Sequence, residues 1–419
     1  MPKSRGRRLK HGGKKPIRRS PVPVRISDLM IRDARRITSW QDPLQVETWA
    51  SDFLGQAWYA APMGGRDTEH HFCMEVAGQA SSTPSPHGLA AVAALARIAG
   101  PKEAEMLAET IEILADSQPL PPWHSAEDPA WTPVKAWRAA NVWDSERVLV
   151  VDYDGPHPHS LLAQVERTGG LWVGVLSAIE PGVADRWAEL RADQEVPMPL
   201  AEQPVAEVLA ELADALRTTD ITWPRNDGDD YISYRALAWS RCRGYLVQEW
   251  TEPERLPETE IRRLVDDFAA ATGQEDAATR SLAELFLSYG EDYIRSGPLA
   301  WSPDQVMLFL TDWLPRKGFL DAPQRAALPD TLREWVAFAL RQRGLDDEWI
   351  APVVQAVDDH LDVFHEAFDD KDAWGPAKQV TAALADLGVD LTDPEAVKQA
   401  ISSLNARRLA DNLAGQLEE

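Results

Sequence analysis

The chain has 419 residues, with 43 lysines and arginines against 67 aspartates and glutamates, for a formal net charge of −24. A content of 44% hydrophobic and 26% charged residues is typical of a globular protein and excludes a wholly disordered or membrane-embedded chain. The only cysteines, Cys73 and Cys242, cannot build a disulfide framework or a cysteine-only zinc site. No apolar run is long enough for a membrane span, and no apolar segment follows the basic N-terminus as in a secretory signal. We therefore expect a soluble, cytoplasmic protein without membrane contact.

Residues 1–27 are predicted to be a disordered basic tail. Residues 1–25 contain ten basic residues and no acidic residue, so the rest of the chain must sum to −34 to give the net charge. Glycines and prolines interrupt the tail, and its few apolar residues cannot offset the conformational entropy lost on folding. The candidate nucleic-acid-binding residues are Lys3, Arg5, Arg7, Arg8, Lys10, Lys14, Lys15, Arg18 and Arg19.

Such a tail is expected to bind nucleic acid or the ribosome in a salt-dependent manner, because its cations release counterions condensed on phosphate. No aromatic residue precedes Trp40, so the tail cannot stack on bases and would not read their sequence. Two other interpretations stay open. The tail is simply solvated, or it folds back onto the acidic remainder of the chain, which should itself repel phosphate.

Residues 28–140 are expected to form an N-terminal helical region that ends in a connector rich in tryptophan and proline. Within residues 118–145 lie Trp123, Trp131, Trp137 and Trp143. Tryptophans in an ordered loop commonly pack over a neighbouring core, and an aromatic ligand cage is the alternative.

Residues 141–182 carry the clearest strand signals. The apolar, β-branched run from Arg147 to Tyr153 is followed by an Asp-Gly-Pro turn, a second strand, a Gly-Gly turn and a third strand at 171–176. Adjacent strands joined by tight turns predict an antiparallel meander rather than a parallel sheet.

After Pro181 the chain is predicted to be helical almost to its end. Residues 183–296 are expected to pack on the sheet, and residues 297–419 to form a C-terminal helical domain. One amphipathic face has apolar residues at helical spacing, namely Val205, Val208, Leu209, Leu212 and Leu216. The predicted fold class is mainly α (α+β), a multi-helical body with one small central antiparallel β-meander.

The stretch SPDQVMLFLTDWLPRKGFLDAPQRAALPDTLREWVAFALRQRGL, followed by GPAKQV and GVDLTDPEAV, resembles the C-terminal part of a family of uncharacterised bacterial proteins. The meander from Arg147 is similar to theirs as well, so that the resemblance covers about half of the chain. It implies a shared, mostly helical fold. It implies no activity and no functional residue.

The string VLVVDYDGPHPH offers the best enzyme-like pattern, because it resembles the first motif of the haloacid dehalogenase-like phosphohydrolases. The resemblance implies Asp152 as nucleophile, Asp154 as general acid and base, and magnesium between the two carboxylates. It further implies Ser177 for the second motif and Asp229 and Asp230 as later metal ligands. The chain departs from the motif, since proline replaces the usual threonine after the glycine and a strand rather than a helix follows. A simple hairpin turn is the other interpretation.

Three further groups of metal-capable side chains are expected to be ordinary structural residues. They are His157 with His159; the string Glu69, His70, His71 and Cys73; and the helix face of Asp358, Asp362 and Glu366. None has the spacing of a zinc finger or a calcium loop, and no phosphate-binding glycine loop occurs. No metal or cofactor is expected, apart from magnesium in the phosphohydrolase alternative.

These patterns favour a non-catalytic interaction protein. Its acidic helical body would contact another protein, and its basic arm would contact nucleic acid or another polyanion without specificity. A metal-dependent phosphohydrolase using Asp152 and Asp154 is the alternative. A third hypothesis is a protein-binding module with an incidental tail.

Overall fold

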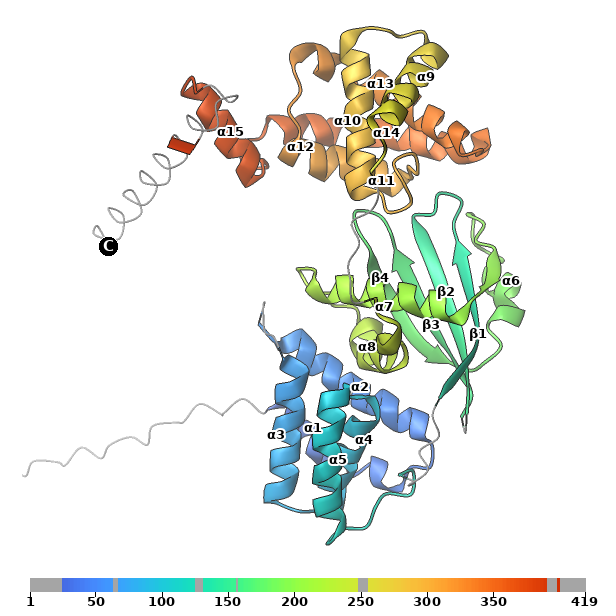
Figure 1. Ribbon diagram of the computed structural model, residues 1–419, viewed down its shortest axis with the longest axis vertical. Coiled ribbons are helices and arrows are strands. Elements are labelled where there is room, and N and C mark those ends of the chain that lie inside the picture. The colour runs from blue at the N-terminus through green and yellow to red at the C-terminus, as the bar shows by residue number, and fades with distance from the viewer. Residues whose placement is uncertain are drawn as a thin grey trace, which may run out of the picture. The chain divides into compact units, whose positions relative to one another are not determined.

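The computed structural model describes residues 25–62, 67–124, 131–155, 157–247, 255–389 and 398–399 (Figure 1). Contacts between residues divide the chain into two compact units, Met1–Ala126 and Glu127–Glu419. The described residues are mainly helical and contain one five-stranded antiparallel sheet, which confirms the predicted fold class. The finer division of the chain into five regions stays a prediction.

The first unit is helical where it is described. Its elements are α1 (Ile26–Asp33), η1 (Ile37–Ser39), α2 (Pro43–Ala60), α3 (Thr68–Ser82), α4 (Pro86–Ile98) and α5 (Pro101–Ala115). Residues 89–95 of α4 are at most 1% exposed, and α4 contacts α2, α3 and α5. Alanines on several sides of α4 let these neighbours approach closely, so α4 forms the centre of the unit.

The sheet of the second unit has the strand order β4-β3-β2-β1-β5, with every neighbouring pair antiparallel. The strands are β1 (Thr132–Ala140), β2 (Glu146–Asp154), β3 (His159–Glu166), β4 (Trp172–Ile179) and β5 (Leu200–Gln203). The predicted meander corresponds to β2, β3 and β4. Two strands were not predicted. β1 lies in the connector expected to be irregular, and the short β5 lies in a region expected to be helical.

Two long helices cover one face of the sheet, and a segment with two short helical turns packs on the other. α7 (Val205–Ile221) contacts β1 to β4, and α8 (Asp229–Cys242), followed by η3 (Arg243–Tyr245), contacts β4. The predicted apolar face of α7 is turned inward, because Val208, Leu209, Leu212 and Leu216 are at most 1% exposed. On the opposite face, Val148 and Val150 form a cluster with residues around η2 (Ala184–Arg186) and α6 (Trp187–Leu190).

The carboxylate of Asp220 joins α7 to α8. Arg235 donates to it through Nε and Nη2, each at 2.6 Å. Tyr231 Oη donates at 3.0 Å and Trp239 Nε1 at 2.9 Å. These four hydrogen bonds to one carboxylate, which we call the Asp220 cluster, hold α7 against α8.

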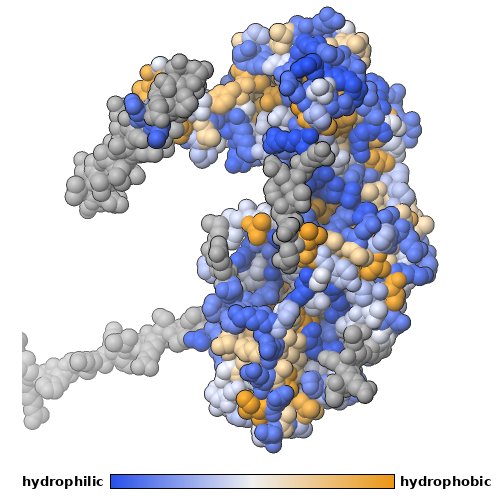
Figure 2. Space-filling view, in the orientation of Figure 1, coloured by the Kyte–Doolittle hydropathy of each residue, from blue (hydrophilic) through white to orange (hydrophobic). Residues whose placement is uncertain are grey.

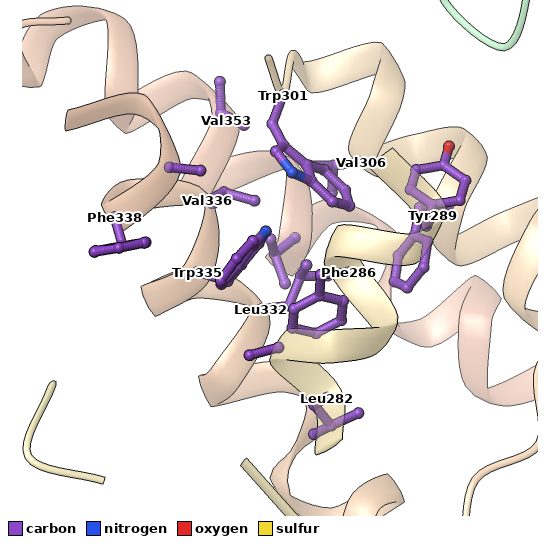
Figure 3. Packing of buried hydrophobic residues seen from close by; sticks show 14 of the residues in the cluster. Leu282, Phe286, Tyr289, Trp301, Val306, Leu332, Trp335, Val336, Phe338 and Val353 are labelled. Atoms are coloured by element: carbon purple, nitrogen blue, oxygen red, sulfur yellow. The ribbon is translucent and has the colours of Figure 1, made fainter. Parts of the chain in front are cut away.

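The second unit continues with helices packed around an aromatic core. They are α9 (Glu258–Thr272), α10 (Ala277–Tyr293), α11 (Pro303–Leu308), η4 (Phe309–Trp313), α12 (Leu314–Lys317), α13 (Ala322–Gln342), α14 (Asp347–Asp369) and α15 (Pro376–Asp386). Figure 3 shows Phe286, Trp301 and Trp335 converging in this core, and all three are 0% exposed. Helices distant in the sequence therefore share one hydrophobic interior.

The turn between β1 and β2 joins the sheet to these helices. Trp143 of this turn belongs to the same aromatic core, and its Nε1 donates to the carbonyl oxygen of Trp349 at 3.0 Å. Arg343 donates to the carbonyl oxygen of Trp143 at 3.1 Å. The next residue, Asp144, has a φ of 58°, and its carbonyl oxygen accepts from Ser296 Oγ at 2.6 Å. Trp143 thus packs over a neighbouring core, as expected for a tryptophan of the connector.

The ionisation of Asp144 makes the stability of this contact between the β1–β2 turn and the helices depend on pH. Burial raises the pKa of its carboxyl group, but the hydrogen bond from Arg147 and the charge of Arg167 outweigh burial and hold it below the ordinary 3.8. A depressed folded-state pKa gives stability that is complete above the unfolded-state value and is lost as the pH falls through the folded-state value.

We expect Asp144→Asn to lower the free energy of unfolding at neutral pH by about 1–2 kcal/mol, since the charge-assisted bonds are lost. Asparagine tolerates the left-handed backbone. The variant should also lose less stability than the native chain between about pH 5 and pH 2. Urea denaturation at a series of pH values measures both effects, with the exposed Asp193→Asn as control. Equal pH slopes for native chain and variant would show that Asp144 is not the group involved.

Candidate functional site

The carboxylates of the enzyme-like string lie at the end of β2. Ser160 Oγ donates to Asp152 Oδ1 at 2.5 Å, and the backbone N–H of Gly155 donates to Asp154 Oδ1 at 2.8 Å. Tyr153, between them, is 2% exposed and lies near Arg241 of α8. Because side chains alternate along a strand, Asp152 and Asp154 are directed to the face of the sheet opposite α8.

This arrangement does not bring together the residues that the phosphohydrolase resemblance implies. α8 begins with the exposed Asp229 and Asp230, on the other side of the sheet from Asp152. Gly155 is followed by the antiparallel strand β3, in which Ser160 is the register partner of Asp152. The motif would need a helix at this point. The geometry is that of a hairpin whose carboxylate is bonded to a serine of the next strand.

His159 of the same string lies among aromatic side chains, and its Nδ1 is 3.2 Å from the backbone oxygen of His157. His159 is 1% exposed, stacks on Tyr153 with 5.2 Å between ring centroids, and meets the edge of Trp131 at 5.0 Å. The guanidinium of Arg241 lies 5.3 Å from the centroid of the Trp131 ring. A Cβ on Gly155 would lie 2.8 Å from Trp131, so this turn position requires glycine. His159 is therefore part of an aromatic stack and also contacts the backbone of His157.

The other predicted metal-capable groups also have structural surroundings. Cys73 is 1% exposed, and burial raises its thiol pKa to about 12. His70 Nδ1 lies 3.1 Å from Glu103 Oε1. Asp358 accepts hydrogen bonds from Arg333 of α13. Among the residues that the structure describes, no three or more His, Cys, Asp or Glu side chains are placed to hold a metal ion.

Lys378 of α15 is a buried cation inside an aromatic box. It is 3% exposed, and its Nζ donates to the carbonyl oxygen of Pro315 at 2.7 Å. The Nζ lies 4.0 Å from the ring centroid of Phe368 and 4.9 Å from that of Trp374. Burial lowers its pKa to about 8. The aromatic faces and the carbonyl oxygen favour its charged form, so we assign it to anchoring α15.

An acidic pocket of about 480 Å³ lies between the sheet and α11. Glu146 and Glu166 are directly opposite each other on β2 and β3, and Asp304 lines the same pocket. Burial raises the pKa of Glu146; Arg191 opposes this effect, and the charges of Glu166 and Asp304 add to it. Gln164 Nε2 donates to Glu146 at 2.8 Å, and Trp172 Nε1 donates to Glu166 at 2.6 Å. These hydrogen bonds offset part of the repulsion between the carboxylates.

A larger groove, of about 980 Å³, lies between α9, α13 and α14. We call it the α9–α13–α14 groove. Its apolar lining includes Ala270, Ala271, Ala337, Phe338, Ile350 and Val354. Charged and uncharged polar residues of the three helices, among them Glu334, complete the lining.

The sequence predicted neither the acidic pocket nor the α9–α13–α14 groove. The acidic pocket depends on the β2–β3 register, which sets two glutamates opposite each other. The groove combines alanines that look unremarkable on each helix taken alone. Only the alternation of alanine with larger apolar residues on α13 could have hinted at it.

The predicted nucleic-acid-binding residues, from Lys3 to Arg19, lie outside the described residues. Within the described part of the chain, no helix combines the length and the apolar character that crossing a membrane requires. Comparison of the chain with models of protein families, with curated proteins and with solved structures found no match.

Proposed function

We propose that this protein is a non-catalytic interaction protein whose basic arm binds nucleic acid or another polyanion and whose acidic body binds another protein. The separation of charge carries the proposal. Ten basic residues and no acidic residue occupy residues 1–25, while the remainder of the chain sums to −34. The proposal needs no metal or cofactor.

The arm supports binding to phosphate rather than to bases. Its arginines can bind phosphate through two parallel donors, and each cation that contacts phosphate releases counterions. Because the body is strongly acidic, it repels phosphate, and the affinity must come from the arm. The complex should therefore be insensitive to base sequence and weaken steeply as salt is added.

The body supports binding to protein. The face in Figure 2 is mostly hydrophilic with separate apolar patches, and the α9–α13–α14 groove adds a concave apolar surface. Cys73 and Cys242 are both buried and free. Free thiols suit a reducing compartment, and we place the protein in the cytoplasm.

The proposal is tested by the binding of labelled single-stranded RNA and duplex DNA across a salt series. We expect the full chain to bind, with a slope of log K against log salt of up to about −7 to −9 if all ten cations engage. Deletion of residues 1–25 should weaken binding at least ~100-fold at low salt.

A chain with the order of residues 1–25 shuffled is the matched control. It keeps the composition and should bind as well as the native chain, because phosphate binding does not depend on residue order. Equal binding by the native and the deleted chains, or no binding by either, would refute the role of the arm. Loss of binding in the shuffled chain alone would show that the order of residues in the arm matters, and not only its charge.

A further inference from the structure

We propose that the α9–α13–α14 groove binds an amphipathic helix of a partner protein that carries a lysine or arginine opposite Glu334. This inference rests on the protein-binding body of the proposed function and states the chemistry of the partner.

The length of the groove fits a helix. The lining residues of α13 extend from Arg333 to Gln342, which is about 13 Å along a helix axis. The apolar anchors of a docked helix at positions i, i+3, i+4 and i+7 span about 10 Å, so that they fit within the groove. Its volume of about 980 Å³ leaves room for these side chains.

The composition of the groove separates an apolar centre from charged ends. Phe338 is 7% and Ile350 is 3% exposed, and they form a floor together with Val354. Alanines of α9, α13 and α14 line the sides, and their small side chains let another backbone approach closely. An apolar centre with a charged rim is the usual anatomy of a protein-binding surface.

The charges of the groove select a basic partner. The arginines of the lining are neutralised within the chain, since Arg333 bonds to Asp358 and Arg341 bonds to Asp347. Glu334 is different, because its Oε2 is buried and has no hydrogen-bond partner among the described residues. Burial and the charge of Asp330 raise its pKa. A partner cation beside this carboxylate would offset both effects, whereas an acidic side chain would add a third repulsive term.

The test uses the full chain and two labelled helical peptides of about 16 residues. Both peptides have leucines at i, i+3, i+4 and i+7 in an alanine background. One peptide has lysine beside the last leucine, and the other has glutamate there. Fluorescence anisotropy at about 150 mM salt, where long-range attraction is screened, measures their affinities.

We expect the lysine peptide to bind about 10-fold more tightly than the glutamate peptide, and Glu334→Lys to reverse this preference. Ala337→Trp fills the groove and should weaken binding of the lysine peptide at least ~10-fold. Ala326→Trp, at an exposed position of the same helix outside the groove, is the matched control and should bind normally. Circular dichroism melting verifies that each variant is folded.

Three outcomes would overturn the inference. Equal weakening by Ala337→Trp and Ala326→Trp would mean that the groove is not the binding site. An unchanged preference in Glu334→Lys would mean that Glu334 does not select the partner. Tighter peptide binding by a chain truncated after Val389 would mean that the protein's own C-terminal residues occupy the groove. Deleting residues 1–25 should leave peptide binding intact, so that a failure of the arm and a failure of the groove are told apart.

Discussion

Replacing Asp220 with alanine is expected to lower the free energy of unfolding by about 3–5 kcal/mol, the usual effect of removing one partner from a buried ion pair. Arg235 is 5% exposed and would lose its bidentate carboxylate partner. Tyr231 is 0% exposed, and burial raises its pKa, so it stays a protonated donor and loses its bond to Asp220. The cost is large because these donors are held where water cannot replace the carboxylate.

Chemical denaturation followed by tryptophan fluorescence and by circular dichroism measures this effect. Asp220→Asn keeps an acceptor and should cost less than the alanine variant. Asp230→Ala, at an exposed position in the first turn of α8, should change stability by less than about 0.5 kcal/mol. If Asp220→Ala lowers the free energy of unfolding no more than Asp230→Ala does, the Asp220 cluster between α7 and α8 does not contribute to stability.

Trp335→Ala is expected to cost about 3–5 kcal/mol, because it leaves a large cavity in the aromatic core. The Trp335 ring lies 5.3 Å from Phe268, 5.9 Å from Phe286 and 5.7 Å from Phe338, measured between centroids. These side chains come from α9, α10 and α13 (Figure 3 shows Phe286, Trp335 and Phe338). The truncation would therefore loosen three helices at once, including two that line the α9–α13–α14 groove.

Trp335→Phe provides a sharper comparison. The indole Nε1 is buried without a hydrogen-bond partner among the described residues, so the native tryptophan already bears a desolvation cost of about 1–3 kcal/mol. Phenylalanine loses volume but removes this cost, and the variant should keep most of the native stability. Thermal and urea unfolding measure the stability of both variants. Trp223 is 56% exposed, and Trp223→Ala is the control. A loss in Trp335→Phe equal to that in Trp335→Ala would show that Nε1 has an acceptor after all.

Local patterns in the sequence determined the fold class and several of its elements. The apolar spacing of α7 predicted the buried face that includes Val208, Leu212 and Leu216, because a period of 3.6 residues aligns such positions on one side of a helix. Apolar, β-branched runs and tight turns predicted β2, β3 and β4 as an antiparallel meander. These inferences succeeded because each depends on residues close together in the chain.

Other features depended on residues far apart in the chain. β1 escaped prediction because Thr132–Ala140 lies in a proline-rich stretch, begins next to Pro133 and becomes a strand by pairing with β2 and β5. The separation of Asp152 from Asp229 required knowledge of which face of the sheet α8 covers. The sequence alone determined the charge of the arm and of the body, since charge is a sum over residues. Only the tertiary structure decided that a carboxylate such as Glu334 has no hydrogen-bond partner for a buried oxygen among the described residues, because burial and pairing are properties of packed helices.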